Sequence, residues 1–307
     1  MKTVTIEPAA GVESTALSKS NPRNRALLDF AELVKARLTM LVLLTTAVGF
    51  YLGAPDGFGP MALFHAVFGT ALAAAGAAAL NQWWERQLDG LMHRTRERPI
   101  PAGRMLPRDA VLLGGTLSVA GVVYLALACN WLSALLAAAT IVIYIFGYTP
   151  LKRISAANTL VGAVPGALPP LIGWAAARNE LGWPAWSLFA ILFCWQMPHF
   201  FAIAWMYRED YARAGFRMLS SSDQDGTRSG RQSVFFAALL VTASCLPAFM
   251  GVTSRANLPF VLCAGVGFLA LAARFAWRRD IPEARRLFLG SIFYLPVLLA
   301  LLCLTKI

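Results

Sequence analysis

Residues 59–101 read GPMALFHAVFGTALAAAGAAALNQWWERQLDGLMHRTRERPIP, so that a strongly apolar segment runs directly into an acidic and then a basic one. The apolar part, residues 59–80, is long enough to cross a hydrocarbon core of roughly 30 Å as an α-helix. Asn81, Glu85 and Asp89 follow at intervals of four residues, which drift by only about 40° per step on an α-helix. The three oxygen-bearing side chains are therefore expected to share one helix face near the membrane surface.

The composition places the chain among membrane proteins. Of its 307 residues, 58% are hydrophobic and only 14% are charged, and the mean hydropathy is +0.59. Soluble domains carry about 25% charged residues, so we predict an all-α fold, a polytopic membrane bundle. Nine transmembrane helices are expected, over residues 38–54, 59–80, 109–129, 131–148, 158–177, 184–206, 233–253, 257–276 and 287–304.

The basic residues predict the orientation of the bundle. With nine spans, 24 of the 27 Lys and Arg residues fall on the side of the N-terminus and three on the other. Because loops rich in Lys and Arg stay in the cytoplasm, the N-terminus is expected in the cytoplasm and the C-terminus in the periplasm. The net charge of +11 is thus a topology signal first. The sequence has no separate basic soluble face of the kind that would indicate nucleic-acid binding. The lipid bilayer is the expected surrounding.

Residues 1–30 are polar and are expected to form a disordered or surface-lying cytoplasmic tail, followed by a single transmembrane domain over residues 31–307. The tail has no apolar signal-peptide core, and Glu7 and Glu13 argue against a mitochondrial transit peptide. These features favour a bacterial inner membrane. The five cysteines form no C-x-x-C pair and are interpreted as small apolar side chains.

The acidic helix end is suited to a metal ion. Two carboxylates and an amide oxygen are ligands that Mg²⁺ accepts, and they leave coordination positions for water and phosphate oxygens. Arg94 and Arg98 follow at once, and they could neutralise the charge on a departing diphosphate. The alternative is a solvated helix end with ordinary salt bridges.

A second acidic helix end follows four spans later. Residues 195–219 read WQMPHFFAIAWMYREDYARAGFRML. On an uninterrupted helix His199 and Asp210, eleven positions apart, fall within about 20° of each other. Asp210 could then complete a second metal site facing the first. Three roles stay open for His199: iron ligation, acid–base transfer, or a hydrogen bond to a neighbouring helix.

A short cytoplasmic turn supplies a third basic element. Residues 148–153 read YTPLKR and are predicted on the same side as the acids. Lys152 and Arg153 both suit phosphate, although the positive-inside rule alone also accounts for them. In the next span, Gly162 and Gly166 form a G-x-x-x-G pattern that indicates close helix packing, and the neighbouring prolines indicate a kink.

Together these motifs resemble the UbiA superfamily of intramembrane prenyltransferases, and within it the protoheme IX farnesyltransferases, or haem O synthases. The resemblance covers roughly residues 30–304. Its motifs in order are N-x-x-x-E-x-x-x-D-x-x-M-x-R-T-x-x-R-P from Asn81 to Pro99, YTPLKR from Tyr148, NTLVG from Asn158, PPLIGW from Pro169 to Trp174, PHF from Pro198 to Phe200 and D-Y-x-x-A-G from Asp210 to Gly215. The first motif marks the superfamily, and the last two point to the haem enzymes.

The chain departs from the family pattern at two positions. Glu85 stands where many relatives have Asp, which retains the carboxylate. Arg217 stands where the family usually has Pro, immediately before Met218 and Leu219, so the family pattern does not define the geometry of this loop.

The resemblance implies transfer of the farnesyl group of farnesyl diphosphate to a vinyl group of haem b, with addition of water, to give haem O for haem–copper oxidases. It implies Mg²⁺ as the cofactor, and haem A synthase or oxidase assembly factors as partners. The implied site residues are Asn81, Glu85, Asp89 and Asp210 as catalytic metal ligands, Arg94, Arg98, Lys152 and Arg153 as diphosphate contacts, and His199 as a haem contact.

Two other functions stay open at this point. One is a sibling enzyme of the same fold that prenylates a quinone precursor or another aromatic ring, which the PHF segment disfavours. The other is a secondary transporter with the acids as ion sites. Acids clustered at one mouth of the bundle, and not at the membrane midplane, disfavour a transporter.

Overall fold

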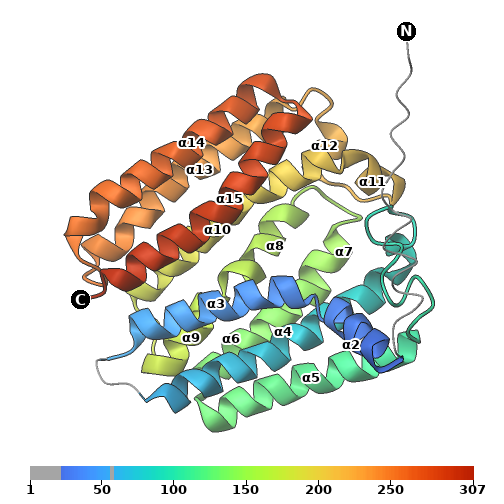
Figure 1. Cartoon of the computed structure of the whole chain (residues 1–307), viewed down its shortest axis with the longest axis horizontal. Helices are drawn as coiled ribbons and strands as arrows, with labels where there is room; N and C mark the ends of the chain where they lie inside the picture. Colours follow the sequence, from blue (N-terminus) through green and yellow to red (C-terminus); the bar gives the residue numbers. More distant parts are fainter. Residues whose placement is uncertain (1–21, 56–58) are drawn as a thin grey trace.

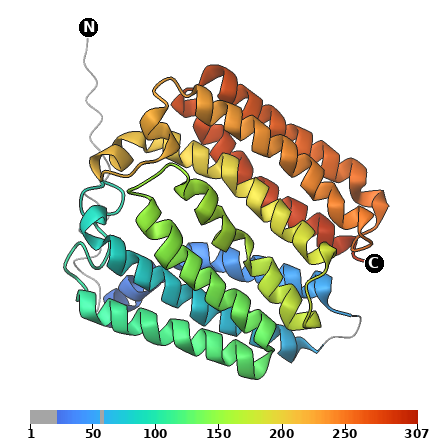
Figure 2. The ribbon, with the colours of Figure 1, turned by 180° about the vertical axis from the view of Figure 1, so that it is seen from behind.

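The computed structural model describes residues 22–55 and 59–307. Within them, nine helical spans are long and apolar enough to cross a membrane, and they pack side by side in one bundle (Figures 1 and 2). The chain is a multi-pass α-helical membrane protein, which confirms the predicted fold class. The spans are α3 (Ala36–Gly53), α4 (Pro60–Asp89), α5 (Pro107–Ala128), α6 (Trp131–Val142) continued by η1 (Ile143–Tyr148) and α7 (Thr149–Leu151), α8 (Asn158–Ala167) with α9 (Pro169–Arg178), α10 (Trp183–Met206), α13 (Thr227–Phe249), η2 (Arg255–Asn257) with α14 (Leu258–Arg278), and α15 (Ile281–Leu304).

The bundle has two distinct ends (Figure 1). The loop that follows α4 lies at one end, together with the short helices α11 (Arg208–Arg213) and α12 (Leu219–Ser222). The C-terminus lies at the other end. Both acidic segments of the sequence therefore reach the same end of the bundle, as the alternation of spans predicts.

The polar tail expected over residues 1–30 is only partly described. Residues 1–21 lie outside the described residues. Residues 22–30 are not disordered, because they belong to the helix α2 (Pro22–Leu33). Most described side chains of α2 are exposed, Leu27 and Leu28 among them, so α2 lies on the surface of the bundle.

Side chains from α4 and from the loop after it hold α2 in place. The buried amide of Gln82 donates hydrogen bonds to the carbonyl oxygens of Glu32 (2.7 Å) and Leu33 (2.9 Å). Arg104 pairs with Asp29 at 2.7 Å and with Glu32 at 3.1 Å. The last turn of α2 is thereby fixed against the acidic helix.

The boundaries of three spans differ from prediction by six residues or more, because polar residues begin or end the helices. α4 continues beyond residue 80 to Asp89, so the three predicted site residues do share one helix. α13 begins at Thr227 and α15 at Ile281, each six residues earlier than expected. At α15 the carboxylate of Asp280 caps the helix by accepting a hydrogen bond from the N–H of Glu283 (2.8 Å). Hydropathy detects only the apolar part of such helices.

The fifth span is broken where its prolines predict a kink. α8 ends at Ala167 and α9 begins at Pro169. A Cβ atom on Gly162 would lie 2.5 Å from the ring of Tyr148, and one on Gly166 would clash with the amide of Gln196. The interpretation of the G-x-x-x-G pattern as a close-packing motif is therefore confirmed.

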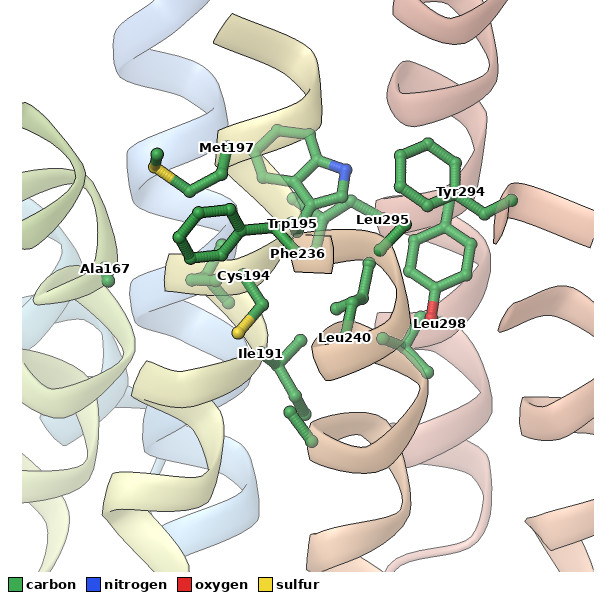
Figure 3. Packing of buried hydrophobic residues seen from close by; sticks show 14 of the residues in the cluster. Ala167, Ile191, Cys194, Trp195, Met197, Phe236, Leu240, Tyr294, Leu295 and Leu298 are labelled. Atoms are coloured by element: carbon green, nitrogen blue, oxygen red, sulfur yellow. The ribbon is translucent and has the colours of Figure 1, made fainter. Parts of the chain in front are cut away.

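The largest apolar cluster lies where α10, α13 and α15 meet (Figure 3). Trp195 of α10, Phe236 of α13 and Tyr294 of α15 belong to it. Some of the buried polar groups inside it are paired: the indole N–H of Trp195 donates to the carbonyl oxygen of Ser291 (2.8 Å), and the hydroxyls of Ser244 and Tyr294 lie 3.0 Å apart. The indole nitrogens of Trp174 and Trp205, also in the cluster, have no hydrogen-bond partner among the described residues. This side of the bundle is a rigid frame for α10.

Candidate functional site

The acidic face of α4 is buried inside the bundle. Asn81 and Asp89 are completely buried, and Glu85 is 4% exposed. Each of the three contacts a cationic side chain from outside α4, as described below. A solvated helix end, the alternative open from the sequence, is excluded by this burial.

The amide of Asn81 is hydrogen-bonded through both its oxygen and its nitrogen. Its Oδ1 accepts hydrogen bonds from the Nζ of Lys35 (2.6 Å) and from the hydroxyl of Tyr144 (3.2 Å). Its Nδ2 donates to the Oγ1 of Thr149 (3.1 Å). In this geometry the amide oxygen is held by an ammonium group, so Asn81 could bind a metal ion only after Lys35 moved.

Lys35 reaches Asn81 from an unusual backbone position. It lies between α2 and α3 with φ 50° and ψ 52°, in the left-handed region, which costs a residue with a side chain about 1 kcal/mol or more. The hydrogen bonds of Gln82 to the end of α2 hold this turn in place. Burial, with the nearby charge of Arg98, lowers the pKa of Lys35 to about 7, against the opposing effect of Glu85.

Sequence reasoning missed Lys35 as a site residue. Its only sequence signal is its position immediately before the first span, where a basic residue is ordinary. A left-handed turn leaves no periodic pattern that a sequence could reveal.

Glu85 forms an ion pair with Lys152. The Nζ of Lys152 lies 2.7 Å from Oε1 of Glu85, 4.5 Å from the ring centre of Tyr148 and 5.5 Å from that of Phe216. Burial acts to lower the pKa of Lys152, but the Glu85 carboxylate and its hydrogen bond raise it well above the usual value. The ammonium group of Lys152 therefore stays charged.

A stretch of π-helix presents the aromatic side of this site. η1 carries Tyr144 and Tyr148, whose rings stack with centroids 5.6 Å apart. Stretches of π-helix are rare and frequently occur at functional sites. Here the wider turn places one tyrosine against Asn81 and the other against Lys152.

Asp89 pairs with Arg98 from the loop after α4. Nη1 of Arg98 lies 2.7 Å from Oδ2 of Asp89, and the hydroxyl of Thr95 donates to the backbone carbonyl of Asp89 (2.8 Å). The second carboxylate oxygen, Oδ1, is buried and has no hydrogen-bond partner among the described residues. Such an orphaned acceptor is costly, and it is the feature of this structure that best fits a bound cation.

The predicted four-residue metal set is not assembled in this structure. Among the described residues, no three His, Cys, Asp or Glu side chains gather closely enough to hold a metal ion. Asp210 pairs with Arg213 of its own short helix, with Oδ1 and Nη1 2.7 Å apart. Metal binding by Asn81, Glu85, Asp89 and Asp210 therefore stays a prediction.

The expectation that His199 and Asp210 share one continuous helix face is wrong. α10 ends at Met206, and Tyr207, with φ −110° and ψ 24°, separates it from α11. The angular argument for an uninterrupted helix does not apply across this break.

The acidic end of α4 and the segment around Asp210 are nevertheless connected through neighbouring residues. Arg94 lies over the ring of Tyr207 (5.2 Å) and donates to the hydroxyl of Tyr211 (3.2 Å). Met92 is buried in a small cluster together with Phe216 and other residues of the second segment. The loop after α4 and the α11 region thus form one continuous wall.

The four predicted diphosphate contacts lie in three different surroundings. Arg98 and Lys152 touch the acids directly. Arg94 contacts the tyrosines of the second segment. Arg153 is exposed, and its side chain makes no hydrogen bond or ion pair with the part of the chain that the structure describes.

The loop at Arg217, which the family pattern did not define, is fixed by backbone hydrogen bonds. The N–H of Arg217 donates to the carbonyl oxygen of Lys152 (2.7 Å). The carbonyl oxygen of Arg217 accepts from Nδ2 of Asn158 (2.9 Å). A proline at this position has no N–H and cannot form the first bond.

His199 makes the interhelical hydrogen bond that was one of its three expected roles. Its Nδ1 lies 2.7 Å from Oγ of Ser291 on α15. The ring also stacks on Trp195 with centroids 5.3 Å apart. Iron ligation through the other ring nitrogen stays open, whereas no acidic partner that would serve acid–base transfer contacts the ring among the described residues.

Known proteins resemble this chain over most of its length. A family model described as the UbiA prenyltransferase family matches residues 42–297. A protein named protoheme IX farnesyltransferase from Solibacter usitatus is 44% identical over 287 residues, which cover 91% of this chain and 98% of the relative. A protein of the same name from Salinibacter ruber is 43% identical over 283 residues, which cover 90% of this chain and 98% of the relative.

Solved structures share the fold at low sequence identity. A structure described for digeranylgeranylglyceryl phosphate synthase in membranes superposes with a TM-score of 0.76 at 15% identity, covering 91% of this chain and 98% of the other. A UbiA homologue from Archaeoglobus fulgidus, bound to DMAPP and Mg²⁺, gives a TM-score of 0.67 at 14% identity, with 89% and 99% covered. At such identities the similarity concerns the fold.

Proposed function

The chain belongs to the UbiA prenyltransferase family, and on this premise we propose that it transfers the farnesyl group of farnesyl diphosphate to a vinyl group of haem b, with addition of water, to form haem O. It is a prenyl-transferring enzyme. The haem acceptor is supported by the names of the relatives and by the PHF and D-Y-x-x-A-G motifs, which include His199 and Asp210.

The observation that carries the proposal is the charge arrangement on the buried face of α4. Lys35, Lys152 and Arg98 surround the carboxylates of Glu85 and Asp89, which leaves an excess of one positive charge when Lys35 is protonated. One carboxylate oxygen is still unpaired. A site with one excess positive charge and an unpaired carboxylate oxygen suits a diphosphate together with a divalent cation.

Mg²⁺ fits this donor set. The residues that would hold it are Glu85 and Asp89, with Asp210 from the facing segment and Asn81 once Lys35 releases its amide oxygen. When bound, the ion supplies charge neutralisation for the departing diphosphate. The related structure that contains a prenyl diphosphate and Mg²⁺ supports this assignment.

The protein groups then account for the reaction. Lys152, Arg98 and Lys35 hold the diphosphate, and Arg94 and Arg153 add positive charge at the rim. The allylic C1–O bond breaks, and its electron pair leaves with the diphosphate. The π pair of the haem vinyl group forms the new C–C bond to C1. Water adds its oxygen to the resulting cation beside the porphyrin and releases a proton, which balances the product as an alcohol.

We place the enzyme in the inner membrane of a bacterial cell. The excess of Lys and Arg on the side of the N-terminus supports a cytoplasmic N-terminus and a periplasmic C-terminus. The diphosphate site then lies at the cytoplasmic end of the bundle, the side from which a charged, water-soluble head group is accessible. Haem A synthase or oxidase assembly factors are the proposed recipients of haem O.

The test is a reaction with defined components. Detergent-solubilised protein receives haem b, farnesyl diphosphate and Mg²⁺, and the products are weighed by mass spectrometry with pyrophosphate release measured in parallel. We expect haem O and pyrophosphate in equal amounts. A parallel reaction with 4-hydroxybenzoate tests the aromatic-ring alternative, and prenylation of that compound instead of haem b would overturn the proposal.

A further inference from the structure

The imidazole ring of His199 is held on several sides. It contacts the ring of Trp195, with centroids 5.3 Å apart and an interplanar angle of 26°, and the ring of Phe288, at 4.9 Å and 33°. Its Nδ1 lies 2.7 Å from Oγ of Ser291. The ring therefore has little freedom to rotate, and the positions of its two nitrogens are set by the protein.

The hydroxyl of Ser291 decides which nitrogen of His199 carries the proton. Oγ of Ser291 also lies 2.5 Å from the carbonyl oxygen of Phe288, to which it donates. A hydroxyl has one proton and a carbonyl oxygen can only accept. The serine proton is thus used on Phe288, and Nδ1 of His199 must donate its own proton to Oγ. In the neutral ring, Nε2 then carries a lone pair.

That lone pair is left open by the protein. Nε2 of His199 makes no hydrogen bond with the described residues. Unlike the indole nitrogens of Trp174 and Trp205, which are buried without a partner, Nε2 is not fully buried and therefore keeps some exposed surface. A neutral imidazole with its other nitrogen donating a hydrogen bond is the usual form of a histidine that ligates a metal.

Ser291 itself is held firmly. It is completely buried, and its backbone carbonyl oxygen accepts the indole N–H of Trp195 (2.8 Å). Trp195 and His199 lie one turn apart on α10, so a single residue of α15 binds both. Figure 3 shows Trp195 among the packed side chains of this region. The hydroxyl of Ser291 is thus held in a fixed position next to His199.

We propose that Ser291 is a positioning residue that fixes the Nδ1-protonated form of His199, so that Nε2 binds the iron of the haem substrate. The identity of the ligand rests on the proposed function, because haem b is the iron-bearing substrate in it. The protonation of the ring does not rest on that function. The two parts are therefore tested separately.

The first experiment reads the ring nitrogens directly, without haem. The chain has three histidines, so ¹⁵N-histidine labelling of a variant with His65→Gln and His93→Gln leaves the signals of His199 alone. We expect Nδ1 to be the protonated nitrogen. Ser291→Ala should populate the Nε2-protonated form, whereas Ser291→Thr, which keeps a hydroxyl, should behave as the parent does. An Nε2-protonated ring in the parent would overturn the proposal.

The second experiment titrates ferric haem b and follows the optical and electron paramagnetic resonance spectra. We expect an imidazole-ligated signature that His199→Ala abolishes. Ser291→Ala should weaken haem binding about tenfold or more, as loss of a partner hydrogen-bonded to a metal ligand usually does, and Ser291→Thr should restore it. Equal affinity and spectra in the parent and in Ser291→Ala would contradict the proposal.

A matched control separates positioning from general stability. Ser244 is also buried in the helix cluster, and its hydroxyl contacts Tyr294 and not His199. Ser244→Ala should leave the haem spectrum and affinity unchanged, and an equal loss in this variant would overturn the assignment of Ser291. If haem binds with the imidazole signature and no haem O forms, the proposed function fails while the role of Ser291 stands.

Discussion

The ammonium group of Lys35 lies 2.6 Å from Oδ1 of Asn81 and thereby joins the start of the first span to the acidic helix. This contact occupies the amide oxygen that the sequence motif assigns to a metal ion. It also brings a third cation to a face that already holds Lys152 and Arg98. The resting site is therefore arranged around cation–carboxylate pairs, into which a diphosphate and its metal must enter.

Lys35→Met should weaken the use of farnesyl diphosphate. A charge-assisted hydrogen bond contributes about 1.5–3 kcal/mol, so we expect kcat/KM for farnesyl diphosphate to fall about tenfold or more, chiefly through KM. Steady-state kinetics of haem O formation measure this. Arg37→Met is the control, because Arg37 is exposed only two residues away. Equal kinetics for Lys35→Met and the parent would remove Lys35 from the site.

Asp89→Asn and Asp210→Asn should each abolish turnover while the protein still inserts into the membrane. Both changes keep the shape of the side chain and remove the charge that would hold the divalent cation, and we expect losses of about a hundredfold or more. Asp109→Asn serves as the control, since Asp109 lies exposed in the first turn of α5. Parent rates of haem O formation in either site variant would contradict the assignment.

Breaking the pair between Glu85 and Lys152 should destabilise the protein. Removing one partner of a buried ion pair costs about 3–5 kcal/mol, because the other charge is left unpaired. Thermal unfolding in detergent should show a lower Tm for Glu85→Gln and for Lys152→Met than for the parent. The double variant should recover part of the loss in Tm and none of the activity. A double variant whose Tm loss equals the sum of the single losses would show that the pair is not coupled.

Chelation of divalent cations should stop the reaction. With EDTA present we expect haem O formation to cease and binding of farnesyl diphosphate, measured by calorimetry, to weaken, because the divalent cation no longer neutralises the diphosphate charge. Added Mg²⁺ should restore both. Unchanged turnover after exhaustive chelation would show that the Lys and Arg side chains of the site neutralise the diphosphate without a metal ion.

The packing of α3 against α9 can be tested at a single glycine. A Cβ atom on Gly173 would run into the backbone of Thr46, and overpacking of this kind costs about 1–3 kcal/mol. Gly173→Ala should therefore lower the Tm. Gly267, which has open space where its Cβ would be, supplies the control: Gly267→Ala should leave the Tm unchanged or slightly raised.

Hydropathy and helical periodicity were sufficient to predict the nine spans and the shared face of Asn81, Glu85 and Asp89, because both depend on residues close together in sequence. Hydropathy also predicted the end of the sixth span at residue 206, where α10 ends. The angular argument for His199 and Asp210 needed a helix that continues past Tyr207, and the sequence of this stretch does not reveal whether it does. The helix α2 was missed because a polar segment is held there by tertiary hydrogen bonds from Gln82.

Within the site, the sequence predicted which kinds of group gather but not which atoms they bind. Arg94 and Arg98 are equivalent in the motif, yet only Arg98 reaches Asp89, because the loop conformation decides between them. Lys35 depends on a left-handed turn, and Ser291 is a single polar residue inside an apolar span. Neither has a sequence signal that distinguishes it from its ordinary neighbours.

The hydrogen bond from the N–H of Arg217 to the carbonyl oxygen of Lys152 has a mechanical consequence. It connects the loop that follows α11 to the backbone of Lys152, whose side chain forms the ion pair with Glu85. Because of this bond, a displacement of the backbone at Arg217 is coupled to the backbone at Lys152, so the two segments are expected to move as one unit. A proline at this position would have no N–H to donate, and the two segments would then lose this connection.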